Sequence, residues 1–191
     1  MLTVLVELQR LKRLDRTGWI LRGLPSGTES VAAHSFGVSL ASMFLVDELA
    51  ARGLAVDSER VLRMALLHDW AEARTGDMPK TATGYFGVAA RRRAEVAAFS
   101  DVVKETGSAA PLYRELYEDY ENRSSLEARL VKAADVIDLL VQTLALERGG
   151  ARGLDEFWDV AQHAEFGLEG EAEKIVHATL KALVDMRRTL V

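Results

Sequence analysis

The amino-acid sequence predicts an all-α fold, on three observations. No stretch of useful length alternates apolar and polar residues with the period of two that marks a half-buried strand. Apolar residues instead recur at helical spacing over most of the chain. The chain has only three prolines, at positions 25, 79 and 111, and each falls at an expected break between helices. No repeat or low-complexity tract divides the 191 residues, so we expect a single domain over residues 1–191.

The apolar spacing places the helices along the chain. They are expected over residues 2–14, 30–51, 60–74, 88–106, 112–120, 126–147, 154–163 and 169–189. A turn rich in glycine, serine and proline separates the first helix from the second. The second helix is expected to turn its large apolar residues toward the core, and these are Phe36, Leu40, Met43 and Phe44.

Polar residues mark the ends of several helices. Asp57 or Ser58 can accept the first backbone N–H groups of the third helix. The stretch Ser124-Ser125-Leu126-Glu127 resembles an amino-terminal cap before the sixth helix, and Gly149-Gly150 ends that helix. The fourth helix is polar, and its run Arg91-Arg92-Arg93 is expected to face solvent, with a place at the mouth of an active site as the alternative.

Composition excludes several classes of protein. The chain has no cysteine, which excludes a disulfide framework, thiolate metal ligands and a cysteine nucleophile. Its 24 basic and 29 acidic residues give a formal net charge of −5, a balance that does not favour a nucleic-acid polymer as partner. The amino terminus lacks a signal-peptide pattern, and no run approaches the roughly 20 apolar residues that span a membrane. We therefore expect a cytoplasmic protein with no membrane partner.

The most informative stretch of the chain is His68-Asp69-Trp70-Ala71-Glu72, which follows the apolar segment 61–67. An unpaired carboxylate in an apolar interior costs several kcal/mol or takes up a proton. A histidine and an aspartate placed there together need a partner, and a divalent cation suits both side chains. Glu72 comes four residues after His68, so the two are expected on one face of the same helix.

Two further residues are candidates for the same cation. His34 lies one turn into an apolar helix, and Asp135 lies in an apolar helix between small alanines and Val136. Alone, His34 would more often be a hydrogen-bonded core histidine than a ligand. Asp138, three residues after Asp135, is expected to be solvated. His163 and His177 lie in polar surroundings and are expected to be surface histidines, so they are not candidates.

Five ordered blocks of sequence carry a family resemblance over about the first three quarters of the chain. They are Arg16-Thr17-Gly18-Trp19; Glu29-Ser30-Val31 with His34; His68-Asp69 with Ala71-Glu72; Gly76-Asp77 with Pro79; and Val131-Lys132 with Asp135. Their order resembles the H…HD…D signature of the HD-domain metal-dependent phosphohydrolases, and most closely the 5′-deoxynucleotidase branch of that family.

The resemblance implies a fold, a metal site and a reaction. The fold is one helical HD domain with a buried divalent cation, manganese, cobalt or magnesium, held by His34, His68, Asp69 and Asp135. The substrate is a deoxynucleoside 5′-monophosphate, and the protein is a homodimer. Glu72 manages protons on the attacking water or the leaving oxygen. Asp77, which would otherwise be a turn or capping aspartate, holds the water or the sugar hydroxyl.

Arg16, Trp19 and Lys132 are the substrate-side candidates. A guanidinium can bind phosphate through two hydrogen bonds, and an indole can pack against a sugar or base. Their alternatives are a salt-bridged arginine, a core tryptophan and a solvated lysine. In the bacterial members of the family an arginine directly precedes the tryptophan, whereas Gly18 stands there in this chain. Arg16 is therefore expected to reach the phosphate from another turn.

Two other functions stay open at the level of sequence. Other HD-domain enzymes hydrolyse nucleoside triphosphates, cyclic dinucleotides or ppGpp with the same four ligands. The second alternative is a metal- or nucleotide-binding module without catalysis. The presence of Glu72 and Asp77 argues against that module, because a pure binding site has no need of a proton-transfer carboxylate.

Overall fold

The computed structural model describes residues 1–189 of the chain. Within that range every regular element is a helix, and the only strand-like feature is an isolated antiparallel bridge between Asp15 and Ser30. The predicted all-α fold is therefore confirmed. No helix in the described range is both long and apolar enough to cross a membrane.

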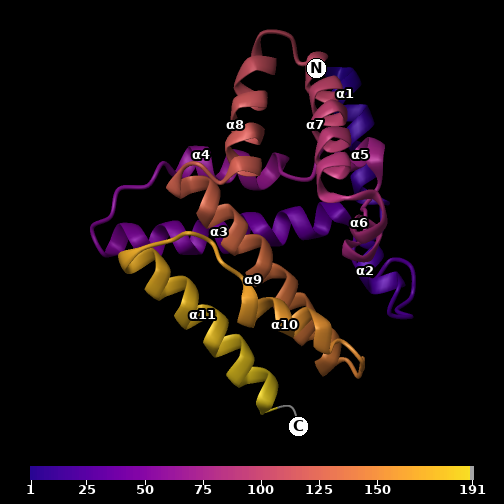
Figure 1. The fold of residues 1–191 in the computed structure, drawn as a ribbon. Coiled ribbons are helices and arrows are strands. Elements are labelled where there is room, and N and C mark those ends of the chain that lie inside the picture. The colour runs from indigo at the N-terminus through magenta and orange to yellow at the C-terminus, as the bar shows by residue number, and fades with distance from the viewer. Residues whose placement is uncertain (190–191) are drawn as a thin grey trace. The chain divides into compact units, whose positions relative to one another are not determined.

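The helices follow one another along the chain, and Figure 1 labels the α-helices among them. They are α1 (Leu2–Leu8), the 3₁₀ helix η1 (Gln9–Lys12), α2 (Thr17–Ile20), α3 (Val31–Ala51), α4 (Ser58–Leu67), α5 (Glu72–Thr75), α6 (Lys80–Phe86), α7 (Val88–Lys104), the 3₁₀ helix η2 (Gly107–Ala109), α8 (Ala110–Asn122), α9 (Leu126–Arg148), α10 (Asp155–His163) and α11 (Gly170–Arg188). Most of the expected helices occur within a few residues of their predicted bounds. The short helices α2 and α6 were not predicted, because each lies in a segment rich in turn residues.

The chain forms two compact units. Unit 1 comprises Met1–Ser35 and Leu67–Glu118, and unit 2 comprises Phe36–Leu66 and the chain from Asp119 onward. The limits between them fall inside α3, at the end of α4 and inside α8.

Two backbone hydrogen bonds and a small apolar core connect separate segments of unit 1. The N–H of Val31 donates to the carbonyl of Leu14 at 2.9 Å, and the N–H of Arg16 donates to the carbonyl of Glu29 at 3.0 Å. The core consists of Leu11, Val31 and Ala73, with Leu8, Leu14, Ala32 and Trp70 packed against it. Helix α7 packs on α1, α5 and α6. The start of α3 and the segment after His68 are thereby fixed to one another.

An aromatic cluster in unit 1 anchors the turn that contains His68 and Asp69. The ring of Trp70 lies 6.3 Å from that of Phe99 in α7 and 5.7 Å from that of Tyr113 in α8. Phe99 in turn stacks on Tyr117 with ring centroids 3.9 Å apart. Aromatic pairs at such separations add to the stabilisation from burial alone. The turn is therefore tied to two helices through the residue that follows Asp69.

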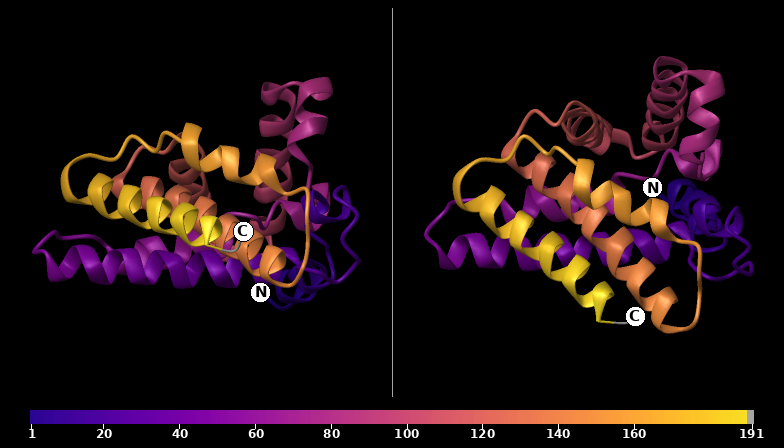
Figure 2. Two further views of the ribbon diagram at one scale, coloured as in Figure 1. Left: turned by 90° about the horizontal axis from the view of Figure 1, so that it is seen from below. Right: turned by 60° about the horizontal axis from the view of Figure 1, so that its bottom comes forward.

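Unit 2 is organised around α9. Helices α10 and α11 both pack on α9 and on each other, as Figures 1 and 2 show. The hydroxyl of Ser125 accepts the N–H of Ala128 at 3.0 Å, and the carboxylate of Asp57 accepts the N–H of Arg60 at 3.0 Å. Both helices therefore begin with a polar cap as predicted, and the capping residue is Ser125 in the stretch 124–127 and Asp57 of the pair Asp57 and Ser58.

The predicted helix 60–74 is broken, and this is a correction. Helix α4 ends at Leu67, residues 68–71 form a turn, and α5 begins at Glu72. The backbone N–H groups of Trp70 and Glu72 donate to carbonyls only three residues earlier, each at 3.0 Å. These tighter bonds end the regular helix. The expectation that His68 and Glu72 share one helix face is wrong.

The orientation of α3 is a second correction. Phe36 and Phe44 were expected inside, yet each is 64% exposed, and Met43 is 36% exposed. The buried side of this helix carries Val38, Leu45, Val46 and Leu49 instead. Because α3 is apolar on all sides, its sequence pattern does not identify the core face.

Candidate metal centre

Two buried imidazoles lie against one carboxylate oxygen in unit 1. His34 occupies the first turn of α3, where the hydroxyl of Ser30 caps the helix by accepting the N–H of Ala33 at 3.1 Å. The Nε2 atoms of His34 and His68 lie 3.7 Å and 3.2 Å from Oδ2 of Asp69. Only 1% of His34 and 3% of His68 are exposed. The structure thus brings three of the four predicted metal ligands together.

Asp69 is held in its ionised form. Burial by itself raises the pKa of a carboxyl group, because the charged form loses hydration. His68, His34 and Arg16 outweigh that effect and hold the pKa of Asp69 below its ordinary value. Nη1 of Arg16 lies 3.5 Å from Oδ2 of Asp69. A charged oxygen beside two imidazoles is the kind of donor that a divalent cation requires.

These three side chains fit a divalent metal ion. The ring nitrogens of His34 and His68 can come within 4.8 Å of one another, so one ion can contact both. Imidazole and carboxylate ligands suit zinc, manganese, iron and related divalent ions, and the lack of cysteine excludes thiolate ligands. The donor set therefore supports metal binding and does not identify the metal.

Glu72 is a buried carboxylate that lacks the usual compensation. It is 6% exposed, and no hydrogen-bond donor from the described part of the chain reaches its Oε2. Burial, followed by the nearby charges of Asp69 and Asp77, raises the pKa of Glu72 well above its ordinary value, while Arg16 and Arg91 act in the opposite direction. A carboxyl group with a raised pKa next to ionised groups is a candidate for proton transfer.

Asp77 connects the segment after α5 to the start of α2 in unit 1. It follows Gly76, whose φ of 75° permits the sharp turn after α5. Its Oδ2 accepts the backbone N–H of Thr17, and the hydroxyl of Thr17 donates to the Asp77 carbonyl at 2.7 Å. Nη1 of Arg16 lies 3.7 Å from its Oδ1. Asp77 therefore caps the start of α2, and a role for it in catalysis stays a prediction.

Asp135 and Lys132 form their own pair on α9 in unit 2. Nζ of Lys132 donates to Oδ2 of Asp135 at 2.6 Å, and the hydroxyl of Tyr120 donates to the same oxygen at 3.3 Å. Lys132 therefore holds an aspartate and is not simply solvated. The place of Asp135 as fourth ligand stays a prediction.

The exposure of Asp138, His163 and His177 in unit 2 differs from one residue to the next. Asp138 is half-buried, and a Cβ added to Gly37 would lie only 1.9 Å from its Oδ1. Its expected solvation is therefore only partial. His163 and His177 are exposed, as predicted.

Trp19 is a core residue in this structure. It is 1% exposed, and its indole N–H donates to Oε2 of Glu29 at 2.6 Å. Glu29 is itself buried, and no pattern in the sequence distinguished it as the partner of Trp19. Contact between Trp19 and a nucleotide would first require the indole to become uncovered.

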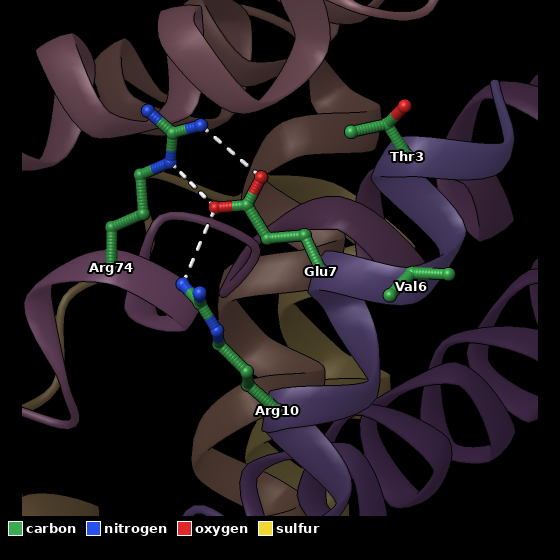
Figure 3. A pocket seen from close by; sticks show the side chains of 5 residues that line it. All are labelled: Thr3, Val6, Glu7, Arg10 and Arg74. Carbon is green, nitrogen blue, oxygen red and sulfur yellow. Dashed lines mark hydrogen bonds and ion pairs between the residues drawn. The ribbon is translucent and has the colours of Figure 1, made fainter.

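An open pocket of about 620 Å³ lies elsewhere in unit 1, lined by Thr3, Val6, Glu7, Arg10 and Arg74. Figure 3 shows the two arginines pointing to the Glu7 carboxylate from either side. Nε of Arg74 donates to it at 2.7 Å, which holds the pKa of Glu7 below its ordinary value. The pocket includes none of the predicted site residues.

Comparisons with known proteins agree with the geometry of unit 1. The family profile of the HD domain matches residues 8–167. The 5′-deoxynucleotidase HDDC2 of Danio rerio is 31% identical over 151 residues, which cover 78% of this chain and 72% of that protein. The 5′-deoxynucleotidase YGK1 of Saccharomyces cerevisiae is 30% identical over 157 residues, covering 78% and 69%. A conserved hypothetical protein from Pyrococcus furiosus superposes with a TM-score of 0.79 and 32% identity, over 98% of this chain and 99% of that one.

Proposed function

Because the chain belongs to the HD-domain family, we propose that it is a metal-dependent 5′-deoxynucleotidase. It hydrolyses deoxynucleoside 5′-monophosphates to deoxynucleosides and phosphate, which makes it a phosphoric monoester hydrolase. The names of its relatives in a fish and a yeast support the substrate class. The observation that carries the proposal is the convergence of His34 and His68 on Asp69, beside the uncompensated carboxylate of Glu72.

The metal ligands are His34, His68, Asp69 and Asp135, and the ion is manganese, cobalt or magnesium. Asp135 is included because it completes the ordered H…HD…D signature of the family. A divalent ion at such a site polarises a phosphate ester and lowers the pKa of a bound water. We also take residues 1–191 to function as one HD domain, since the family match runs through residues of both units.

Glu72 carries the proton in this reaction. In the hydrolysis a water oxygen forms a bond to phosphorus, the bond from phosphorus to O5′ breaks, and one water proton ends on the nucleoside O5′. The Glu72 carboxylate accepts that proton from the water and returns it to the leaving oxygen. Its raised pKa supports this role, because a general acid or base is most efficient when its pKa approaches the working pH.

The remaining candidate residues bind and orient the substrate. Arg16 contacts the phosphate and, through its position beside Asp69 and Asp77, places it against the metal ligands. Asp77 orients the water or the sugar hydroxyl, and Lys132 is a further phosphate contact once it leaves Asp135. Trp19 packs against the sugar or base of the nucleotide once its indole, which donates to Glu29, becomes uncovered.

The protein is also proposed to be a homodimer in the cytoplasm that takes a nucleotide and no nucleic-acid polymer. The exposed face of α3 supports self-association through Phe36, Met43 and Phe44. A buried aromatic side chain covers about 150–250 Å², so this stripe contributes a few hundred Å², enough for the apolar centre of an interface of about 800 Å² per copy. A two-fold dimer would place the same stripe from each copy in contact.

Sedimentation of wild type and Phe44→Glu tests the dimer. Wild type is expected to sediment as a dimer at micromolar concentration and the variant as a monomer. A monomeric wild type, or a variant that stays dimeric, would contradict the assignment of this face.

The activity is tested with protein stripped of metal and reloaded with manganese, cobalt or magnesium. Released phosphate is measured with dAMP, dCMP, dGMP, dTMP and dUMP. We expect turnover with at least one metal and none after the metal has been stripped. The absence of phosphate release from every nucleotide with every metal would refute the proposed function.

A further inference from the structure

Arg91 differs from the two arginines that follow it in the sequence. Its side chain is 29% exposed, whereas Arg92 and Arg93 are exposed residues. The sequence favoured a solvated run over a place at the mouth of the active site, and the Arg91 side chain is only partly solvated. A half-buried guanidinium loses part of its hydration, so its position needs a specific partner.

Two contacts fix the Arg91 side chain. Its Nε donates to Oε1 of Glu95, one turn later in α7, at 2.7 Å. Its Nη1 donates to the hydroxyl of Thr83 in α6 at 3.3 Å. These two helices pack on each other, and α7 also packs on α5 (Figure 1). Arg91 is thus held against α6, the helix that follows Asp77, and it lies on α7, which also packs against the helix that begins at Glu72.

The charge of Arg91 acts on the candidate catalytic carboxylates. Burial lowers the pKa of Arg91, but Glu95 and then Glu72 and Asp77 raise it above the ordinary value. Neither Glu72 nor Asp77 forms an ion pair with Arg91 in the described structure; its direct carboxylate partner is Glu95. The guanidinium therefore lies near Glu72 and Asp77 but forms its ion pair with Glu95.

Arg91 retains the capacity to bind an anion. A guanidinium carries five N–H donors in a fixed fork, which suits phosphate oxygens in pairs. Within the described chain two of these donors are engaged, one by Glu95 and one by Thr83. Three donors are left on a side chain whose orientation is already fixed, so binding would cost little further conformational entropy.

We propose that Arg91 is a binding residue for the phosphate group of the substrate. It acts in addition to Arg16, which lies beside Asp69 and Asp77 and comes from the segment before α2. The inference rests on the proposed function, because it names a contact of the same nucleotide with the same site. Glu95 and Thr83 are then positioning residues that aim the guanidinium.

The test compares Arg91→Gln and Arg91→Lys with Arg93→Gln as the matched control on the same helix. Steady-state kinetics with the best deoxynucleotide give kcat and KM, and inhibition constants are measured for inorganic phosphate and for an uncharged deoxynucleoside. Loss of a charge-assisted contact should weaken inhibition by phosphate about 10-fold or more in Arg91→Gln. Inhibition by the deoxynucleoside should stay unchanged, and Arg93→Gln should match wild type.

Arg91→Lys keeps the charge and is expected to fold even if the glutamine variant does not. It should still bind phosphate more weakly than wild type, because an ammonium group cannot reproduce the two-point contact. Unchanged phosphate inhibition in both variants would overturn the proposal. A shift of the pH profile of kcat without a change in phosphate inhibition would overturn it too, since Arg91 would then only balance the charge of Glu72.

A failure of the proposed function can be distinguished from a failure of this inference. If wild type turns over deoxynucleotides and the Arg91 variants bind phosphate normally, only the inference fails. If wild type has no activity, calorimetric titration of metal-loaded wild type and Arg91→Gln with inorganic phosphate still tests the contact. Equal binding by the two proteins would then refute it.

Discussion

Two carboxylates that are largely withdrawn from solvent, Asp119 and Glu72, have opposite surroundings in this chain. Asp119 in unit 2 accepts three hydrogen bonds: from Nη2 of Arg60 at 2.6 Å, from the backbone N–H of Ser125 at 2.9 Å and from the Ser125 hydroxyl at 2.7 Å. Glu72 in unit 1 has a buried Oε2 that no donor of the described chain reaches. Both side chains are mostly removed from solvent. Within the described chain, only Asp119 has hydrogen-bond donors on both of its carboxylate oxygens.

The pKa values of these two groups move in opposite directions. Burial raises the pKa of both, but the hydrogen bonds from Arg60 and Ser125 outweigh it and hold the pKa of Asp119 below its ordinary value. At Glu72 the nearby charges of Asp69 and Asp77 add to the effect of burial. The compensated carboxylate stabilises the fold, and the uncompensated one is available for chemistry.

The largest expected effect is on turnover by Glu72→Gln. The amide has nearly the same shape but cannot accept the proton, so kcat should fall by about 10²–10⁴-fold. Metal content, measured by elemental analysis, should stay near wild type, because Glu72 is not a proposed ligand. Full activity in this variant would show that the uncompensated carboxylate has no catalytic role.

The next largest effect is on stability, from Asp119→Asn. Removing the charge leaves Arg60 and the Ser125 donors poorly matched, and the free energy of unfolding in urea should fall by about 1–3 kcal/mol. Turnover per folded molecule should not change. Asp185→Asn is the control, since that exposed carboxylate pairs only with surface cations and its loss should have little effect. Equal stability losses in the two variants would contradict the account of Asp119.

The stabilisation from Asp119 should depend on pH in a defined direction. Its folded-state pKa is lowered, so the advantage of wild type over Asp119→Asn is complete above the unfolded-state pKa of about 3.9 and decreases as pH falls below it. Urea unfolding of both proteins at neutral and acidic pH measures the difference. A difference that stays constant down to the lowest pH would contradict the cited hydrogen bonds.

The smallest expected effect is on the stability of metal-free protein, where the contribution of Glu72 should depend on pH in the opposite direction to that of Asp119. Its folded-state pKa is raised, so the folded form retains a proton that the unfolded chain loses above about pH 4.3. Metal-free wild type should therefore lose stability relative to Glu72→Gln as pH rises from that value. If wild type gained stability over the variant in that range, Glu72 would have to be compensated after all.

The sequence identified residues of the candidate site correctly, but it did not predict the break in the helix that positions them. His34, His68 and Asp69 were identified because imidazole and carboxylate side chains in apolar segments require a partner, and the structure brings them together. The break between α4 and α5 was missed, since the residues around His68 are all compatible with a continuous helix. We attribute the end of the helix at Leu67 to tertiary packing. The Trp70 ring packs on α7 and α8, and the His68 imidazole is buried.

Two other features could not be predicted for a related reason. The apolar residues of α3 surround the helix, so their spacing does not distinguish a core face from an exposed one. Arg91 stands in a run of three identical side chains, and only the contacts to Glu95 and Thr83 single it out. Charge and burial depend on neighbours that are distant in the sequence.

The most direct test of the central claim is the release of phosphate by metal-loaded wild type from mono-, di- and triphosphates of deoxy- and ribonucleosides. The proposed function predicts that deoxynucleoside 5′-monophosphates are hydrolysed to inorganic phosphate with the highest kcat/KM. Hydrolysis confined to triphosphates, or no hydrolysis of any nucleotide with any metal, would contradict it.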